Sequence, residues 1–157
     1  MNLDLAYEKN PGFMIRRLQQ VAMALYIRSL KEFELTPLQY TILNVVKAKG
    51  GIDQISIAKI SVLDTSTVRD IVERLEAKKL IVRTVGEHDR RTRNVALSEA
   101  GDRLLEAARP FVEEARTKLL GPLTAHEREL LMTIVDKVVS AHEAKLNFER
   151  DRDIWRR

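Results

Sequence analysis

The sequence predicts a mostly α-helical protein that contains one small β-hairpin. Three observations lead to this fold class. Apolar residues recur at helical spacing over most of the 157 residues, and capping residues followed by proline mark helix starts at Asn10 and Thr36. A single stretch, from Leu80 to Leu97, changes to β-branched residues with a polar turn in its middle. The length fits one domain, or one domain with a dimerisation arm.

The first helix is expected from Asn10, with Pro11 in its first turn, to about Lys31. Its apolar residues cover more than one face, which is typical of a helix buried on two sides. We expect one face to pack on its own chain and the other on a partner subunit. A second helix starts at Thr36-Pro37 and stops at Gly50-Gly51, and residues 54–60 form a short third one.

Asp64 is expected to cap a fourth helix. Its inner positions have the spacing i, i+3, i+4 and i+7 and are all aliphatic: Val68, Ile71, Val72 and Leu75. Its outer face is polar and charged: Thr65, Ser66, Arg69, Asp70, Glu73 and Arg74.

Residues 80–85 and 94–97 are predicted to pair as a hairpin around the turn 86–92. Ser98 then begins a long helix to about Leu120, in which Pro110 should cause a kink or a break. Thr124 and Glu127 form a capping box that opens the last helix.

The composition excludes several classes of protein. The chain is 45% hydrophobic and 32% charged, so it can bury a core, and it has no cysteine for disulfides, zinc ribbons, iron–sulfur clusters or thiol redox sensing. No apolar run reaches the roughly 18 residues needed to cross a bilayer, and the N-terminus lacks the pattern of a secretory signal. We therefore expect a soluble, cytoplasmic protein without membrane contact.

The positive charge is concentrated in one place. Residues 78–93 contain six basic and two acidic side chains, so this window alone carries the net charge of +4 that the whole chain has. Such a concentration favours a polyanionic partner, although a solvated basic loop would give the same composition.

Residues 36–97 follow the element order of a winged helix-turn-helix, whose last helix can enter a DNA major groove about 12 Å wide. Hydroxyls and long basic side chains on this helix could reach phosphates and base edges, and the arginines of the hairpin suit a narrow minor groove. Each feature alone could be a helix cap or a solvated loop, but their joint occurrence favours double-stranded DNA. The basic stretch has no aromatic residue for base stacking, which disfavours single strands. The candidate DNA-binding residues are Thr65, Ser66, Thr67, Arg69, Asp70, Arg74, Arg90, Arg91 and Arg93.

Five short motifs are spread along nearly the whole chain. They are Leu35-Thr36-Pro37-Leu38-Gln39, Asp64-x-Ser66-Thr67-Val68, Arg74-Leu75-Glu76, Asp89-Arg90-Arg91 and Leu97-Ser98-Glu99-Ala100-Gly101. Together they resemble the MarR family of bacterial transcriptional regulators. The Asp-Arg-Arg turn followed by Leu-Ser-Glu-x-Gly is the more specific part of this resemblance.

The resemblance implies a homodimer built by residues 10–35 and 98–147, with residues 36–97 binding a pseudopalindrome in promoter DNA. It also implies a repressor whose DNA binding is weakened by a small ligand, often an aromatic acid. Asp89 is then expected to brace an arginine, and Arg91 to enter the minor groove. The segment 12–20 is similar to that of family members controlling aromatic-acid or nicotinate breakdown.

The chain departs from the family pattern at two positions where glycine is common. Lys79 stands just before the Leu-Ile that opens the hairpin, and the turn Ile60-Ser61-Val62-Leu63 contains no glycine. Lys79 would need a permissive backbone conformation or a differently shaped helix end.

An aromatic carboxylate ligand would need a cation and a hydrogen-bonding group in an apolar pocket. The candidate effector-binding residues are Arg16, Arg17, Gln20, Tyr26 and Tyr40. The alternative for the two arginines is an ion pair within the helix or between subunits. The pattern favours neither catalysis nor a cofactor: His88, His126 and His142 share no metal-ligand spacing, and no serine lies in a nucleophile turn.

Two other functions share these features. One is an architectural DNA-binding protein without an effector, and the other is a protein-interaction module whose basic hairpin is incidental. The sequence leaves open whether the regulator represses or activates, and whether residues 148–157 pack on a partner or fray.

Overall fold

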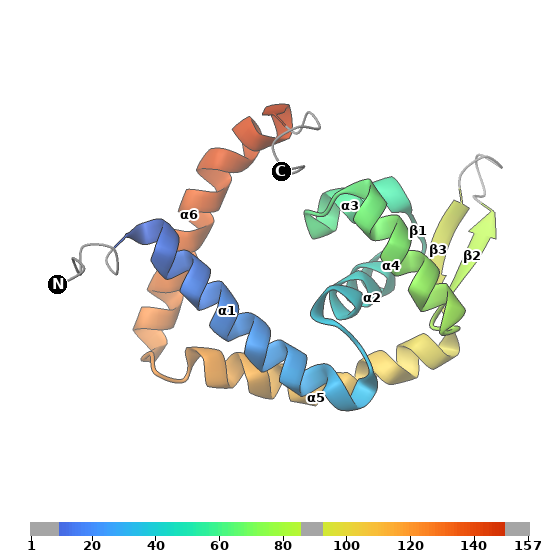
Figure 1. The fold of residues 1–157 in the computed structure, drawn as a ribbon, viewed down its shortest axis with the longest axis horizontal. Helices are drawn as coiled ribbons and strands as arrows, with labels where there is room; N and C mark the ends of the chain where they lie inside the picture. Colours follow the sequence, from blue (N-terminus) through green and yellow to red (C-terminus); the bar gives the residue numbers. More distant parts are fainter. Residues whose placement is uncertain (1–9, 86–92, 150–157) are drawn as a thin grey trace, which may run out of the picture. The chain divides into compact units, whose positions relative to one another are not determined.

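The computed structural model describes residues 10–85 and 93–149, without the side chains of Val85, Arg93 and residues 143–149 (Figure 1). The helices are α1 (Pro11–Leu30), the 3-10 helix η2 (Lys31–Phe33), α2 (Pro37–Lys49), α3 (Gln54–Ser61), α4 (Thr65–Ala77), α5 (Glu99–Leu120) and α6 (Ala125–Glu149). The strands are β1 (Ile52–Asp53), β2 (Ile81–Val85) and β3 (Arg93–Leu97). The predicted fold class, mostly α with a small hairpin wing, is confirmed.

Side-chain caps explain where the helices begin. The Asn10 carboxamide oxygen accepts from the backbone N–H groups of Gly12 and Phe13, and Thr36 and Gln39 form a capping box at α2. Glu127 accepts hydrogen bonds from the backbone and the hydroxyl of Thr124 at the start of α6. The three predicted starts are therefore confirmed, and η2 is an addition that the sequence analysis did not predict.

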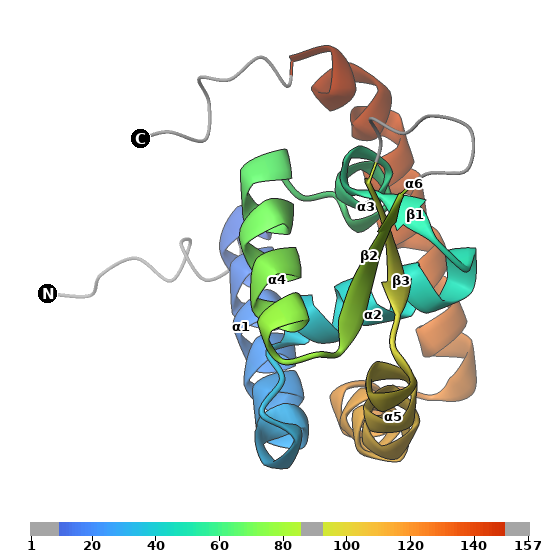
Figure 2. The ribbon, with the colours of Figure 1, turned by 90° about the vertical axis from the view of Figure 1, so that its right-hand side faces the viewer.

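The wing is a three-stranded antiparallel sheet with the order β1-β3-β2 (Figure 2). The predicted hairpin is confirmed, with Ile81 opposite Leu97 and Val85 opposite Arg93. The third strand, β1, was missed because it is only two residues long, and it pairs through Ile52 with Val95, far away in the sequence.

The core lies between α2, α3, α4 and the sheet. All four inner residues predicted for α4 are buried, and Val68, Val72 and Leu75 have no exposed surface at all. They pack with residues of the other elements: Leu30, Ile42, Leu43, Val46, Ile57, Ile81, Val95, Leu105 and Ala108. This buried side fixes α4 so that its opposite face points outward.

The two positions without the expected glycine adopt the left-handed backbone conformation. Val62 has φ 55° and ends α3, and Lys79 has φ 59° and follows α4. Of the two alternatives left open for Lys79, a permissive conformation or a differently shaped helix end, the structure shows the permissive conformation. A side chain in this region is strained because its Cβ approaches the backbone.

Helix α5 is continuous through Pro110, so the break that the sequence analysis allowed does not occur. Proline removes one backbone N–H donor, and the rest of this 22-residue helix keeps its hydrogen bonds on either side.

By their internal contacts, the residues form two compact units, one ending at Leu119 and the other beginning at Leu120. The first contains the winged fold together with α1 and nearly all of α5, and the second contains α6. Every helix in the described ranges is too short or too polar to cross a membrane.

Candidate nucleic-acid interface

The outer face of α4 is the best-defined part of the candidate interface. Thr65, Ser66, Arg69, Asp70 and Arg74 are exposed, and Thr67 is half-buried. Because the inner face of the helix is locked into the core, these side chains are presented on a rigid support. The structure therefore brings together the six candidate residues that the sequence analysis placed on this helix.

Asp64 organises the first turn of α4. Its carboxylate accepts from the Ser66 hydroxyl at 2.5 Å, the Thr67 hydroxyl at 2.6 Å and the Thr67 backbone N–H at 2.7 Å. The Ser66 hydroxyl, followed by the two Thr67 groups, holds the pKa of Asp64 well below its usual range. The carboxylate is thus charged at the positive end of the helix, where it stabilises the fold.

These bonds determine what the two hydroxyls can offer to a ligand. Each hydroxyl has one hydrogen, and both Ser66 and Thr67 donate this hydrogen to the Asp64 carboxylate. In this arrangement they can accept hydrogen bonds from outside but cannot donate to a phosphate. Thr67 also donates its backbone N–H to Asp64, and Val68 donates its own to the Asp64 carbonyl. The backbone N–H groups of Thr65 and Ser66 and the long side chains of Arg69 and Arg74 remain as donors for a phosphate or a base edge.

Both arginines of α4 reach into solvent. Arg69 Nε lies 4.0 Å from Asp70 Oδ1, with both side chains more than half exposed. An ion pair this long and exposed contributes little, so Arg69 is available to an external anion.

The wing is braced against α4 by Arg83 on β2. Its Nε lies 2.9 Å from Glu76 Oε2 near the end of α4, in an ion pair rather than a directed hydrogen bond. Asp89, Arg90 and Arg91 lie outside the described residues, and Arg93 opens β3 with only its backbone described. Their predicted roles stay predictions.

A groove of about 630 Å³ lies beside α4 within the first unit. Met23, Ile27 and Ile71 give it apolar walls, and Lys31 and Arg74 bring positive charge. The other lining residues are Glu34, Leu35, Thr36, Pro37, Leu38, Gln39, Thr67 and Asp70. Its volume falls in the range of small-molecule sites.

Gln39 is the most buried polar side chain of the described core, with 6% of its surface exposed. Its Oε1 accepts from the backbone N–H of Thr36 at 3.0 Å. In the described part of the chain its amide NH₂ has no hydrogen-bond partner, and Gln39 is one of the residues that line the groove. This group could not be found from the sequence, because a capping-box glutamine carries no sign that its second polar atom has no partner.

The predicted effector residues are not in this groove. Arg16, Arg17 and Gln20 are exposed on α1, and the Arg17 guanidinium lies 5.8 Å from the centre of the Phe13 ring. Tyr26 and Tyr40 are half-buried, and none of the five residues lines the groove. Among the described residues no three His, Asp or Glu side chains gather as metal ligands would.

Comparison with known proteins identifies the family. The profile of the MarR family matches residues 33–92. The transcriptional repressor NicR of Pseudomonas putida is 30% identical over 132 residues, covering 84% of each chain. Among solved structures, BpsR of Bordetella bronchiseptica, whose DNA binding is regulated by 6-hydroxynicotinic acid, has a TM-score of 0.80 at 28% identity over 84% of this chain and 94% of its own.

A structure of PcaV from Streptomyces coelicolor, in complex with its natural ligand, also has a TM-score of 0.80, at 30% identity over 90% of this chain and 98% of its own. These relatives are regulators and not enzymes, which confirms the prediction that the chain has no catalytic role. The winged fold, the polar α4 face and these matches agree: the chain belongs to the MarR family and is a DNA-binding transcriptional regulator.

Proposed function

We propose that this regulator is a homodimeric repressor that binds a pseudopalindromic operator and is released from it by a small aromatic carboxylate. The observation that carries the proposal is the construction of α4, whose buried inner face and capped first turn hold Arg69 and Arg74 outward on one rigid surface. In this proposal α4 reads the major groove, and Arg90, Arg91 and Arg93 of the wing enter the minor groove.

Exposed apolar side chains support the dimer. Among the described side chains, six large hydrophobic ones are exposed on α6 and six more on α1. Leaving such rows of apolar side chains exposed to water is unfavourable, so we expect a second copy of the chain to pack against them. Residues 10–35 and 98–147 would form the dimerisation region and 36–97 the DNA-binding domain.

The groove supports release by a ligand. The apolar walls suit an aromatic ring, and Lys31, Arg74 and the Gln39 NH₂ suit its carboxylate. The carboxylates of Glu34 and Asp70 also line the groove, so the carboxylate of the ligand would have to lie on the side of the two cations. Arg74 belongs both to the groove and to the outer face of α4, so a ligand that holds Arg74 removes it from DNA. Such differential affinity for the free and the DNA-bound states is what effector release requires. The regulation of BpsR by 6-hydroxynicotinic acid suggests hydroxylated pyridine carboxylates as the first ligands to try.

Two sets of variants test the proposal. Arg91→Ala should weaken operator binding while the protein stays dimeric; wild-type affinity in this variant would remove the wing from the mechanism. For the effector, release should be lost in Gln39→Leu if the ligand lies in the groove, and in Arg16→Ala or Arg17→Ala if it lies along α1. If all three variants are released from the operator by benzoates and pyridine carboxylates as readily as the wild type is, both sites are excluded. If none of these compounds releases the wild type, an effector-independent architectural protein is favoured.

A further inference from the structure

The first turns of α5 are fixed against the turn between α4 and β2. Ser98 donates its backbone N–H to the Leu80 carbonyl at 3.1 Å and its hydroxyl to the Lys79 carbonyl at 2.7 Å. The backbone N–H of Gly101 in turn donates to the Ser98 hydroxyl at 2.9 Å. A Cβ on Gly101 would lie 2.0 Å from the Leu80 oxygen, so the two backbones are in direct contact.

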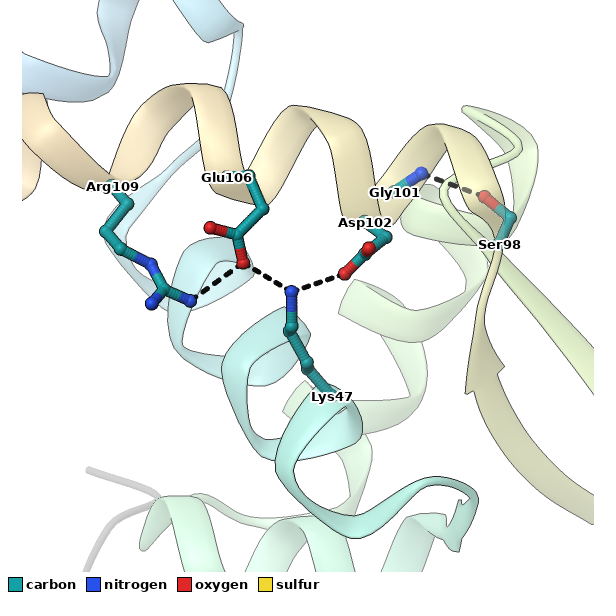
Figure 3. Close-up of polar contacts among 6 residues, drawn as sticks. All are labelled: Lys47, Ser98, Gly101, Asp102, Glu106 and Arg109. Atoms are coloured by element: carbon teal, nitrogen blue, oxygen red, sulfur yellow. Dashed lines mark hydrogen bonds and ion pairs between the residues drawn. The ribbon is translucent and has the colours of Figure 1, made fainter.

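A second connection crosses from α2 to the next turns of α5 (Figure 3). Lys47 Nζ donates to Asp102 Oδ1 at 2.5 Å and also to Glu106, which accepts from Arg109 as well, at 2.9 Å. The Lys47 side chain is 34% exposed. The hydrogen bonds to Asp102 and then to Glu106 raise the pKa of Lys47, so its ammonium group stays charged through the physiological range.

This ion-pair cluster differs from the other ion pairs of α5. Glu99 with Arg103, Glu113 with Arg116 and Glu114 with Lys118 each join neighbouring turns of the same helix. Lys47 joins residues 55 and 59 positions away in the sequence, and so it fixes one element relative to another.

The cluster ends where the backbone of α5 is weakest. Pro110 follows Arg109 directly and has no N–H to donate to the Glu106 carbonyl, so one helical hydrogen bond is missing at this turn. From Glu106 the helix continues to Leu120, roughly 21 Å at 1.5 Å per residue. A tilt of about 10° near Glu106 would therefore move its far end by about 4 Å, close to the rise of one base pair.

We propose that Lys47, through Asp102 and Glu106, is a positioning residue for operator binding: it fixes the direction in which α5 leaves the winged domain, and thereby the separation of the two recognition helices. The inference rests on the proposed dimer and pseudopalindromic operator. Two recognition helices must match half-sites about 34 Å apart, so a device that fixes their separation determines which operator spacing is bound best.

The test measures affinity for operators whose centre is shortened or lengthened by one base pair. In the wild type the best spacing should be strongly preferred. Lys47→Met should lower this preference by about threefold, a modest change, because the ion-pair cluster is partly exposed and screened by solvent. Lys47→Arg should preserve it, and Arg103→Met, which loses the same charge from an ion pair within α5, should leave it unchanged.

The double variant Asp102→Asn/Glu106→Gln separates positioning from direct DNA contact, because it keeps the charge of Lys47. It should relax the spacing preference as Lys47→Met does, and both should keep the wild-type dependence of affinity on salt. If Lys47 instead contacts a phosphate, Lys47→Met lowers affinity equally at all spacings and reduces the salt slope by about one charge, and the inference is wrong.

Two further outcomes are distinguishable. If the wild type prefers one spacing and every variant keeps that preference, the positioning role is wrong and the proposed function stands. If the wild type shows no preference among inverted repeats, the proposed dimeric operator binding itself fails, and the inference fails with it. Thermal unfolding and sedimentation of each variant verify that it is folded and has the wild-type oligomeric state.

Discussion

Val62 and Lys79 show most directly how single residues determine this fold. Both have a positive φ, and both occupy places where the sequence analysis noted that glycine was missing. Val62 is 59% exposed and its side chain is branched at Cβ, so the strain is not offset by burial. The winged fold requires a left-handed backbone at these two positions, and Val62 and Lys79 adopt it despite the strain that their Cβ atoms cause.

Val62→Gly and Lys79→Gly should therefore each stabilise the protein by about 0.5–1 kcal/mol, the strain relieved less the entropy that glycine adds to the unfolded chain. Urea unfolding measures the change. Lys59→Gly is the matched control, because Lys59 is exposed within α3. This substitution should lower the free energy of unfolding by about 1 kcal/mol. Equal losses at all three positions would show that the two residues are not strained.

Gly101 should give the opposite result. In a helix, Gly→Ala usually stabilises, but here the added Cβ would lie 2.0 Å from the Leu80 carbonyl oxygen. Gly101→Ala should therefore destabilise the protein by about 2–3 kcal/mol through overpacking of the junction between α5 and the α4–β2 turn. Gly12→Ala, where the nearest atom is a side-chain oxygen at 3.2 Å, should be close to neutral in the same unfolding measurement. A neutral Gly101→Ala would mean that the junction is loose.

At the scale of elements, local signals predicted most of the fold. Asn10, Thr36, Asp64 and Thr124 act as predicted caps, because a cap depends on residues within three positions of itself. What the sequence could not show depends on distant contacts. Strand β1 exists because Ile52 meets Val95, and the Lys47 cluster joins α2 to α5.

The candidate site likewise has features that could be predicted from local sequence and others that depend on distant contacts. The outer face of α4 was predictable, since the aliphatic spacing of its inner face fixes which residues point outward. The orientation of the Ser66 and Thr67 hydroxyls toward Asp64, and the groove with its Gln39 donor, were not predictable. Hydrogen-bond direction and cavity shape depend on packing between elements that periodicity does not describe.

The Asp64 cap should make the stability of α4 depend on pH. The pKa of Asp64 is lower in the folded than in the unfolded chain, where it is about 3.9, because Ser66 and Thr67 donate to the carboxylate. Its contribution is therefore fully present above that value and is lost as the pH falls toward the folded pKa.

Asp64→Ala should lower the free energy of unfolding by about 1 kcal/mol at pH 7. The difference in unfolding free energy between this variant and the wild type should become smaller below about pH 4. Unfolding free energies between pH 7 and pH 2 measure it. Thr36→Ala removes an uncharged cap, so its cost should not change with pH through the titration of the cap. A cost of Asp64→Ala that is constant down to pH 2 would contradict the carboxylate's role.

At the scale of the whole molecule, the exposed apolar rows predict assembly. Val135 and Val138 on α6 are 43% and 53% exposed in the single chain, with other large hydrophobic residues on the same helix. If a second copy covers them, a charge placed there must be desolvated on association.

Val135→Glu and Val138→Glu should each shift the protein toward the monomer, as sedimentation would show, and should reduce operator binding with it. Lys137→Glu is the control on the same helix, since its exposed position is already charged. A dimer that survives both valine substitutions would place the interface elsewhere.

Sequence-specific operator binding, on which the proposed repressor function depends, is tested most directly by a gel shift with the DNA upstream of the protein's own gene. The assay is run at about 150 mM salt with an excess of unrelated duplex, because non-specific phosphate binding weakens steeply with salt and competitor. We expect a discrete complex that resists the competitor and dissociates when the correct aromatic carboxylate is added. A smear that the competitor abolishes, for this fragment and for every fragment selected from the genome, would show that the protein does not bind DNA sequence-specifically.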